Sequence, residues 1–267
     1  MTRYPAVAGQ FYPSDEKRLR AQLQELIPPR EEKAKVTAVI SPHAGYVYSG
    51  SVAGLLYSRI EIPPTVIILG PNHTGYGAPA ALFPEGEWIT PLGPVPVEPV
   101  LSALVRAHAP AVTEDAEAHR YEHSLEVQVP FLRFLQPQLS IVPLCIGFGS
   151  AAAARQVGEG LAEAVREYGR DTLIVASSDM THYETAESAK KKDEEALAAV
   201  MAMDPERLIA VCREKRITMC GVAPSAVMLY AARALGGSSA ELVAYATSGD
   251  VSGDYRNVVA YAGVTVS

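Results

Sequence analysis

The chain has 267 residues, of which 48% are hydrophobic and 20% are charged. This length is sufficient to bury a substantial core, and the composition is typical of globular proteins, which excludes a disordered chain. The net charge of −7 argues against a nucleic-acid partner, because such partners favour proteins with a basic face.

The sequence predicts neither a membrane span nor a signal peptide. No apolar run approaches the roughly 18 to 20 residues that cross a bilayer. The N-terminus, MTRYPAVAGQFYP, lacks the long apolar stretch of a signal peptide. Three scattered cysteines, Cys145, Cys212 and Cys220, are too few for a disulfide framework. We therefore expect a reduced, cytoplasmic protein.

Short apolar runs rich in β-branched residues alternate with segments of helical spacing. The predicted strands are 36–40, 65–69, 139–144, 172–177, 241–246 and 257–266. The predicted helices are 15–27, 50–59, 98–108, 123–135, 151–168, 186–202, 205–215 and 222–235. Continuous apolar runs indicate strands covered on both faces, and alternation with helices indicates crossover connections. The sequence therefore predicts an α/β fold, a mostly parallel sheet flanked by helices, in a single domain over 1–267.

Polar residues and prolines mark several boundaries of these elements. Ser14 is expected to cap the helix 15–27, and Asp204 followed by Pro205 is typical of a helix start. The stretch 75–99 contains six prolines and is predicted as the longest irregular segment. A loop of this length in a compact domain often forms a lid or the wall of a site.

Polar side chains follow three of the predicted strands. His43 follows VTAVISP, His73 follows TVIILGPN, and Asp179 and His182 follow TLIVASS. Because the carboxyl ends of parallel strands lie at one edge of a sheet, where ligands bind, these side chains are expected to converge.

A second polar group stands in the motif EAHRYEHSLEVQ, at the start of the predicted helix 123–135. Glu122 and His123 lie at the first residues of this helix, and Glu126 is expected one turn after Glu122. His119 stands just before them, and its role stays open.

Each of these residues has a structural alternative. A single histidine at a strand end is more often a hydrogen-bonded structural group than a ligand. Two such histidines, with a third strand ending in Asp-x-x-His, favour a functional site. His108 is expected to be structural because it ends a helix.

The cysteines divide in the same way. Cys145 and Cys212 stand in apolar runs and are expected in the core. Cys220 precedes the helix 222–235, and a helix N-terminus favours the thiolate that binds metals or attacks carbon. Core residue, metal ligand and nucleophile remain open for Cys220. No phosphate loop, dinucleotide fingerprint or Gly-x-Ser-x-Gly elbow is present, which argues against a nucleotide cofactor.

Taken together, the motifs SPHAGYVYSG, GPNHTG, EHSLEVQ, SSDMTH and TMCG resemble those of the MEMO family. The opening RYPAVAGQFYP and the closing GDYRNVVAYAGV fit as well, so the resemblance covers essentially the whole chain. The family is similar to class III extradiol dioxygenases of the LigB type, which implies a non-haem metal pocket at the strand ends of an α/β sheet. In prokaryotes the resemblance also implies two partners, an AMMECR1-like protein and a radical SAM protein.

The resemblance implies particular site residues. The implied metal ligands are His43, His73 and Cys220. The implied catalytic residues of the same pocket are Glu122, His123, Asp179 and His182. Extradiol dioxygenases hold Fe(II) with two histidines and a carboxylate, whereas a cysteine is softer and also suits copper(I) or zinc. We expect iron, with copper or zinc as alternatives.

Three functions remain open. The preferred one is a metal-dependent redox enzyme in which His182 moves protons, Asp179 orients His182, and Tyr46 and Tyr48 shape the pocket. The second is a module that binds peptides, phosphopeptides or partner proteins without turnover. The third is a zinc-dependent hydrolase with His182 or Glu122 as the base.

Overall fold

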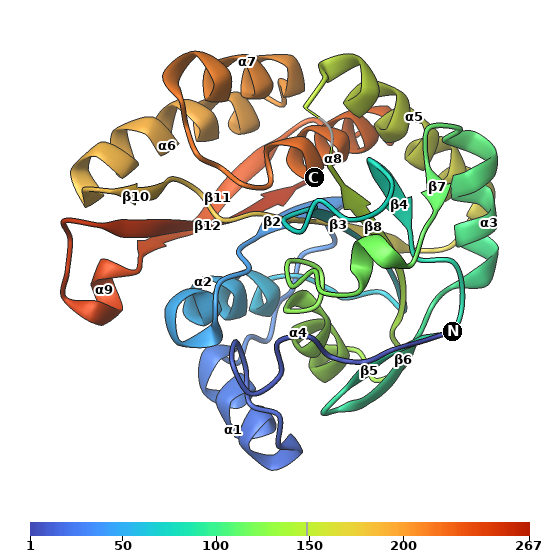
Figure 1. Cartoon of the computed structure of the whole chain (residues 1–267), viewed down its shortest axis with the longest axis horizontal. Coiled ribbons are helices and arrows are strands. Elements are labelled where there is room, and N and C mark those ends of the chain that lie inside the picture. The colour runs from blue at the N-terminus through green and yellow to red at the C-terminus, as the bar shows by residue number, and fades with distance from the viewer. Residues whose placement is uncertain (148) are drawn as a thin grey trace.

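The computed structural model describes residues 1–147 and 149–267 (Figure 1). The helices are α1 (Glu16–Leu26), α2 (Tyr46–Ser58), α3 (Pro99–His108), α4 (Gln128–Leu135), α5 (Ala151–Tyr168), α6 (Ala186–Met201), α7 (Pro205–Lys215), α8 (Val222–Ala234) and α9 (Gly249–Ser252), with one 3-10 helix, η1 (Glu117–His119). The strands are β1 (Thr2–Arg3), β2 (Ala38–Ser41), β3 (Thr65–Pro71), β4 (Ala80–Leu82), β5 (Glu87–Thr90), β6 (Gly93–Pro96), β7 (Thr113–Glu114), β8 (Ser140–Ile146), β9 (Thr172–Ser177), β10 (His182–Glu184), β11 (Ala240–Thr247) and β12 (Val258–Val266).

The main sheet has a parallel centre with antiparallel flanks. Its strands follow the order β10-β12-β2-β9-β3-β8-β4-β7, and β11 pairs with β12. The neighbouring pairs β2–β9, β9–β3 and β3–β8 are parallel. Strand β12 runs antiparallel to β2, β10 and β11. The predicted α/β fold with a mostly parallel sheet flanked by helices is confirmed.

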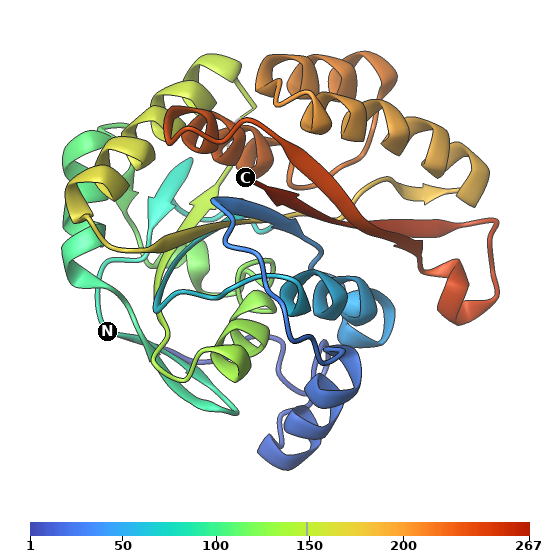
Figure 2. The ribbon, with the colours of Figure 1, turned by 180° about the vertical axis from the view of Figure 1, so that it is seen from behind.

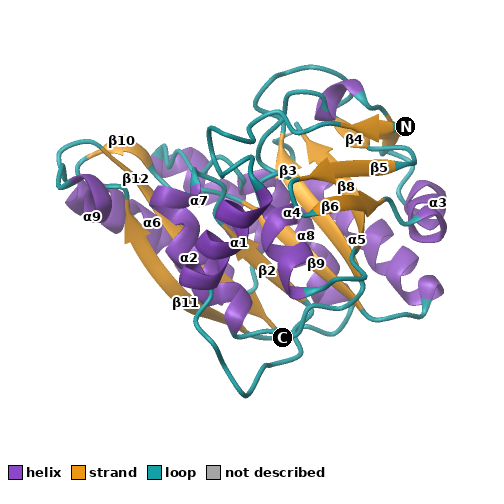
Figure 3. Cartoon of the chain, turned by 90° about the horizontal axis from the view of Figure 1, so that it is seen from below, coloured by secondary structure: helices purple, strands orange, loops and turns teal. Residues whose placement is uncertain are grey.

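Helices cover both faces of this sheet (Figures 1 and 3). Alternate residues of a strand point to opposite faces, so β3 sends Ile67 and Leu69 into a core with α3, α5, α6, α7 and α8. Val66 and Ile68 point into a second core with α1, α2 and α4. Burial on both faces is the reason that the parallel strands read as continuous apolar runs.

Strands β11 and β12 form a long antiparallel hairpin that reaches away from the body of the molecule, with α9 at its tip (Figure 2). The sequence predicts both strands, and their pairing gives this side of the sheet its antiparallel flank. Among the described residues, none of the helices has both the length and the apolar character needed to cross a membrane.

Several predicted boundaries need correction. The segment 75–99 is not irregular, because it contains β4, β5 and β6, and β5 and β6 form a small sheet with β1. The helix predicted over 123–135 begins only at Gln128. Glu122, His123 and Glu126 therefore lie before α4, in a loop and turn that side-chain hydrogen bonds and a few backbone bonds shape, such as that from the N–H of Val127 to the carbonyl of His123 at 3.1 Å.

Helix caps follow local chemistry. Asp15, not Ser14, caps α1, since its side chain accepts a hydrogen bond from the backbone N–H of Arg18. Asp204 caps α7 with Pro205 at the first helical position, as predicted. A carboxylate or hydroxyl that satisfies a free N–H at a helix start stabilises the helix by about 1 kcal/mol.

Candidate metal centre

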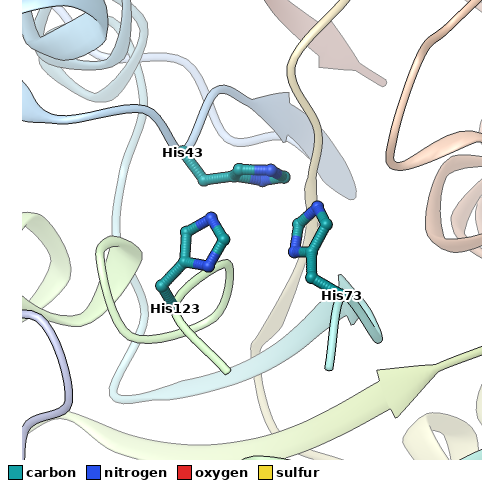
Figure 4. A group of neighbouring side chains, drawn as sticks. All are labelled: His43, His73 and His123. Atoms are coloured by element: carbon teal, nitrogen blue, oxygen red, sulfur yellow. The ribbon is translucent and has the colours of Figure 1, made fainter. Parts of the chain in front are cut away.

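The candidate site lies at the carboxyl edge of the parallel strands. His43 follows β2, His73 follows β3 and Asp179 follows β9, so three adjacent elements of the sheet deliver these residues to one place. His123 comes from the loop between η1 and α4. In Figure 4 the rings of His43, His73 and His123 face a common space.

The three imidazoles are close enough to share a metal ion. One nitrogen of each ring lies within 4.8 Å of the corresponding nitrogens of the other two. The ring centroids of His73 and His123 are 4.7 Å apart and nearly stacked, and His43 lies 5.2 Å from His73 and 5.5 Å from His123, edge-on to both. Sequence reasoning placed His123 in the pocket without assigning it to this group.

Glu122 fixes the ring of His73. Its Oε1 lies 2.8 Å from Nδ1 of His73, and its Oε2 accepts the backbone N–H of His73 at 2.6 Å. Burial alone would raise the pKa of Glu122, but the bonds from His73 and from the backbone of Ser124 hold it at about 2. Because the ionised carboxylate only accepts, Nδ1 of His73 carries the proton and Nε2 is free to bind a metal.

Ser177 fixes the ring of His43 by a hydrogen bond at Nδ1, as Glu122 does for His73. Its hydroxyl donates to the carbonyl of Ser124 at 2.6 Å and lies 2.9 Å from Nδ1 of His43. Since the hydroxyl has a single proton, it accepts from Nδ1, and Nε2 of His43 is the unprotonated nitrogen. Burial lowers the pKa of His43, and the neighbouring histidines lower it further. Burial also lowers the pKa of His123, although the charge of Glu122 opposes this shift. Both rings are therefore neutral at neutral pH.

Cys220 lies beside this group but outside it. Its Sγ is 3.1 Å from Nε2 of His43 and accepts the backbone N–H of Asp179 at 3.2 Å. The expected shift toward thiolate is wrong, because burial and the charge of Asp179 raise the pKa of the thiol despite its place before α8. The ligand set His43, His73 and Cys220 stays a prediction, and the three histidines form the tighter group.

Asp179 and His182 both line the pocket. The prediction that Asp179 orients His182 is not met, because each of the two side chains bonds to a different partner. Asp179 accepts the backbone N–H of His43 at 2.7 Å, and burial raises its pKa to about 7. Nδ1 of His182 lies 3.0 Å from the carbonyl of Thr218. Because a carbonyl only accepts, Nδ1 carries the proton, and Thr218, not Asp179, orients the ring.

The site opens into a cavity of about 780 Å³. Tyr48 lines this cavity as predicted, whereas Tyr46 is buried and donates its hydroxyl to the carbonyl of Val127 at 2.7 Å. Aromatic residues that sequence reasoning missed form much of the wall, namely Phe11, Tyr183 and Tyr261. The backbone of Tyr183 is strained, with a φ of 60°, and the residue is 78% exposed. No local pattern in the sequence predicts this conformation.

Two other histidines are structural. His119 is fully buried, with Nε2 3.0 Å from the carbonyl of Ala81, and it packs edge-on against Phe83 and Trp88. His108 ends α3, as predicted, and its Nε2 lies 2.6 Å from a carboxylate oxygen of Glu167 in α5. Cys145 and Cys212 are buried, as predicted.

Comparison with known proteins places the whole chain in one family. The model of the family described as Memo-like protein matches residues 3–265. The chain belongs to the MEMO family. A MEMO1 family protein of Aquifex aeolicus is 44% identical over 265 residues, with 98% of each chain covered. A MEMO1 family protein of Methanopyrus kandleri is 40% identical over 278 residues, which covers 99% of this chain and 98% of that one.

Among solved structures, this MEMO-family chain is similar to an uncharacterized protein of Escherichia coli K12. The TM-score is 0.58 at 18% identity, and the match covers 87% of this chain and all of that one. At this identity the similarity concerns the fold alone. The family resemblance that the sequence motifs carry is thus confirmed by relatives over its full length.

Proposed function

We propose that this MEMO-family protein is a metal-dependent redox enzyme with a non-haem iron or copper ion held by His43, His73 and His123. The observation that carries the proposal is the close group of three imidazoles, in which a buried carboxylate and a hydroxyl orient the rings of His73 and His43. Oriented imidazoles, of which His43 and His73 carry an unprotonated Nε2, are a donor set that iron, copper and zinc accept. Cys220, beside His43, supplies a further soft donor.

A bound iron or copper ion would supply one-electron redox chemistry to a substrate in the cavity. The residues of the chain supply binding and proton transfer. The tautomer of His182 leaves Nε2 as an acceptor at the wall of the cavity, and burial lowers the pKa of this ring, so it is neutral and able to take a proton. Asp179, with a pKa near neutrality, is suited to hold or release a proton beside the ligands.

A zinc-dependent hydrolase is the second candidate. The specific observation in its favour is that three histidines, rather than two histidines and a carboxylate, form the close group. Three histidines with one open position are a ligand set of catalytic zinc, which lowers the pKa of a bound water. In this case Asp179 would serve as the base.

Phosphopeptide binding receives less support. Sites that hold phosphate use arginine or lysine side chains to pair with its charge. The described residues that line the cavity include no lysine or arginine, and they include the carboxyl group of Asp179. The partners implied by the family resemblance, an AMMECR1-like protein and a radical SAM protein, remain a proposal that co-purification of the three proteins would test.

The decisive experiment is to purify the untagged protein without oxygen, quantify bound metals, and reconstitute it separately with Fe(II), Cu(I) and Zn(II). Stoichiometric iron or copper, together with redox turnover of a small-molecule panel, is the expected result. Zinc with hydrolytic turnover would replace the redox enzyme by the hydrolase. Failure to retain any of the three metals would overturn both enzyme proposals.

A further inference from the structure

A buried ion pair ties the N-terminal segment to the loop that carries Glu122 and His123. Arg3 and Glu126 lie 2.9 Å apart, and their side chains are 4% and 3% exposed. In Figure 1 the N-terminal chain (dark blue) runs from the N-terminus past α4 to α1. Ion pairs this deeply buried are uncommon, since removing two charges from water is costly unless all their hydrogen bonds are satisfied.

The guanidinium of Arg3 contacts the loop at three separate points. Nε donates to the carbonyl of His119 at 2.7 Å, one terminal nitrogen donates to the carbonyl of Glu122 at 2.7 Å, and the other pairs with Glu126. The face of the guanidinium lies over the ring of Trp88, with Cζ 4.1 Å from the ring centroid. The planar, rigid fork of arginine thus holds two backbone carbonyls before His123 and, through an ion pair, the Glu126 side chain after it.

Glu126 completes the connection from the loop to the N-terminal segment. Its carboxylate accepts the backbone N–H of Ala6 at 2.8 Å, that of Val7 at 3.0 Å and the hydroxyl of Tyr12 at 2.7 Å, in addition to Arg3. Four donors therefore satisfy both oxygens of a carboxylate that lies three residues from His123. The segment from residue 3 to residue 12 is bound to the loop through this carboxylate and through the guanidinium of Arg3.

The loop depends on these contacts because it contains a turn but no helix or strand between η1 and Gln128. Side-chain bonds from Glu122 to His73 and from Ser124 to the carbonyl of Pro71 join it to the end of β3. The hydroxyls of Ser177 and Tyr46 also donate to its carbonyls at Ser124 and Val127. Arg3 and Glu126 hold it from the opposite side, against the N-terminal segment. The two sets of bonds together define where the His123 ring and the Glu122 carboxylate stand.

From this arrangement we infer that Arg3 and Glu126 are positioning residues of the metal centre, and that the N-terminal segment orders the ligand-bearing loop through them. The inference rests on the proposed function, since it concerns the same metal site. Neither residue lines the cavity that contains the three histidines. They act through Glu122 and His123, as outer partners that orient the groups which bind.

The test uses the full chain and Co(II) as the probe, with the variants Arg3→Met and Glu126→Gln. Each variant is expected to bind Co(II) about 10- to 100-fold more weakly than the wild type and to show a changed visible spectrum, because the ligands are no longer held in one geometry. The matched control is Leu208→Ala in α7, a fully buried residue of the other core, which lowers stability without contacting the loop. This control is expected to keep the Co(II) affinity and spectrum of the wild type.

Amide hydrogen exchange provides a readout that needs no metal. In Arg3→Met the amides of residues 119–127 are expected to exchange at least about 10-fold faster than in the wild type, whereas those of β3 and β9 keep their protection. If Arg3→Met does not fold, Arg3→Lys is the milder variant, since it keeps the charge but cannot supply three donors in one plane. The same two measurements then apply to it.

The outcomes separate the inference from the function on which it rests. Wild-type Co(II) affinity and unchanged exchange in the folded variants would overturn the positioning role and leave the metal centre intact. A wild-type protein that binds no Co(II), yet whose loop loses protection in Arg3→Met, would overturn the metal centre while supporting the ordering of the loop. Weaker binding in the Leu208→Ala control to the same degree as in Arg3→Met would reduce the effect to general destabilisation and would also overturn the inference.

Discussion

Glu122 and His73 form a two-point contact in which one carboxylate holds both the ring and the backbone of a strand-end histidine. One oxygen lies 2.8 Å from Nδ1 and the other accepts the backbone N–H at 2.6 Å. The carboxylate is fully buried and comes from a loop 49 residues away in sequence. The relationship sets the tautomer and the direction of Nε2 before any ligand binds.

Replacing Glu122 by Gln tests this contact. All partners of the carboxylate are donors, including the backbone N–H of Ser124 at 2.9 Å, so the amide NH₂ of Gln would face a donor. We expect metal affinity to fall about 10- to 100-fold, as is typical for loss of a carboxylate partner of a ligand histidine. Competition with a chelating dye measures the affinity. Glu117→Gln, at an exposed position nearby, serves as the control and should bind metal normally; equal affinity in both variants would contradict the role of Glu122.

Single substitutions decide the ligand set. If the three histidines bind the metal, His43→Ala, His73→Ala and His123→Ala each lose it, because two remaining imidazoles hold a divalent ion weakly. Cys220→Ser should then retain most of the metal, and the metal content of purified protein measures this. His108→Ala, which removes a surface histidine, is the control. Loss of metal in Cys220→Ser with retention in His123→Ala would favour the set of His43, His73 and Cys220 instead.

The buried imidazole of His119 gives stability a dependence on pH. Burial, and to a lesser degree the charge of Arg3, lowers the pKa of His119 to about 3 in the folded protein. The unfolded chain, with an ordinary pKa near 6.5, binds the proton first. The free energy of unfolding should therefore fall, by roughly 1.4 kcal/mol per pH unit, as the pH decreases from about 6.5 toward 3.

The variant His119→Gln removes this contribution, since Gln does not titrate and can still donate to the carbonyl of Ala81. Urea unfolding at pH 7, 6, 5 and 4 gives the free energy of unfolding for both proteins. The difference between wild type and variant should shrink as the pH falls, because only the wild type loses stability through residue 119. Parallel pH profiles of the two proteins would show that His119 is protonated in the folded state at its ordinary pKa.

The contact between α1 and α2 requires glycine at position 54. A Cβ atom built there would lie 2.0 Å from the carbonyl oxygen of Leu26, at the last residue of α1. We expect Gly54→Ala to destabilise the protein by about 2 kcal/mol despite the higher helix propensity of Ala, because the end of α1 must move. Thermal and urea unfolding measure the change. Ser51→Ala, at an exposed position of the same helix, should be neutral, and an equally neutral Gly54→Ala would show that the two helices separate easily.

Much of the fold is readable in the sequence because it depends on local patterns. The continuous run at 65–69 predicts a strand buried on both faces, and β3 is such a strand. The cap at Asp204 with Pro205 is confirmed for the same reason, since capping involves residues within one turn. The strands within 75–99 are not predicted, because the prolines of this segment indicate a loop and its pairing partners, Thr2 in β1 and Ile146 in β8, are distant in sequence.

The sequence by itself determined that His43, His73 and Asp179 stand at the carboxyl ends of parallel strands, because strand periodicity and strand ends are encoded by neighbouring residues. Only the tertiary structure decided which groups complete the site. It brings His123 from a loop into the group of histidines. It also places Asp179 where it accepts the backbone N–H of His43, and His182 where its Nδ1 donates to the carbonyl of Thr218. The direction of a side chain depends on hydrogen bonds to residues distant in the chain, and no local pattern of residues specifies those bonds.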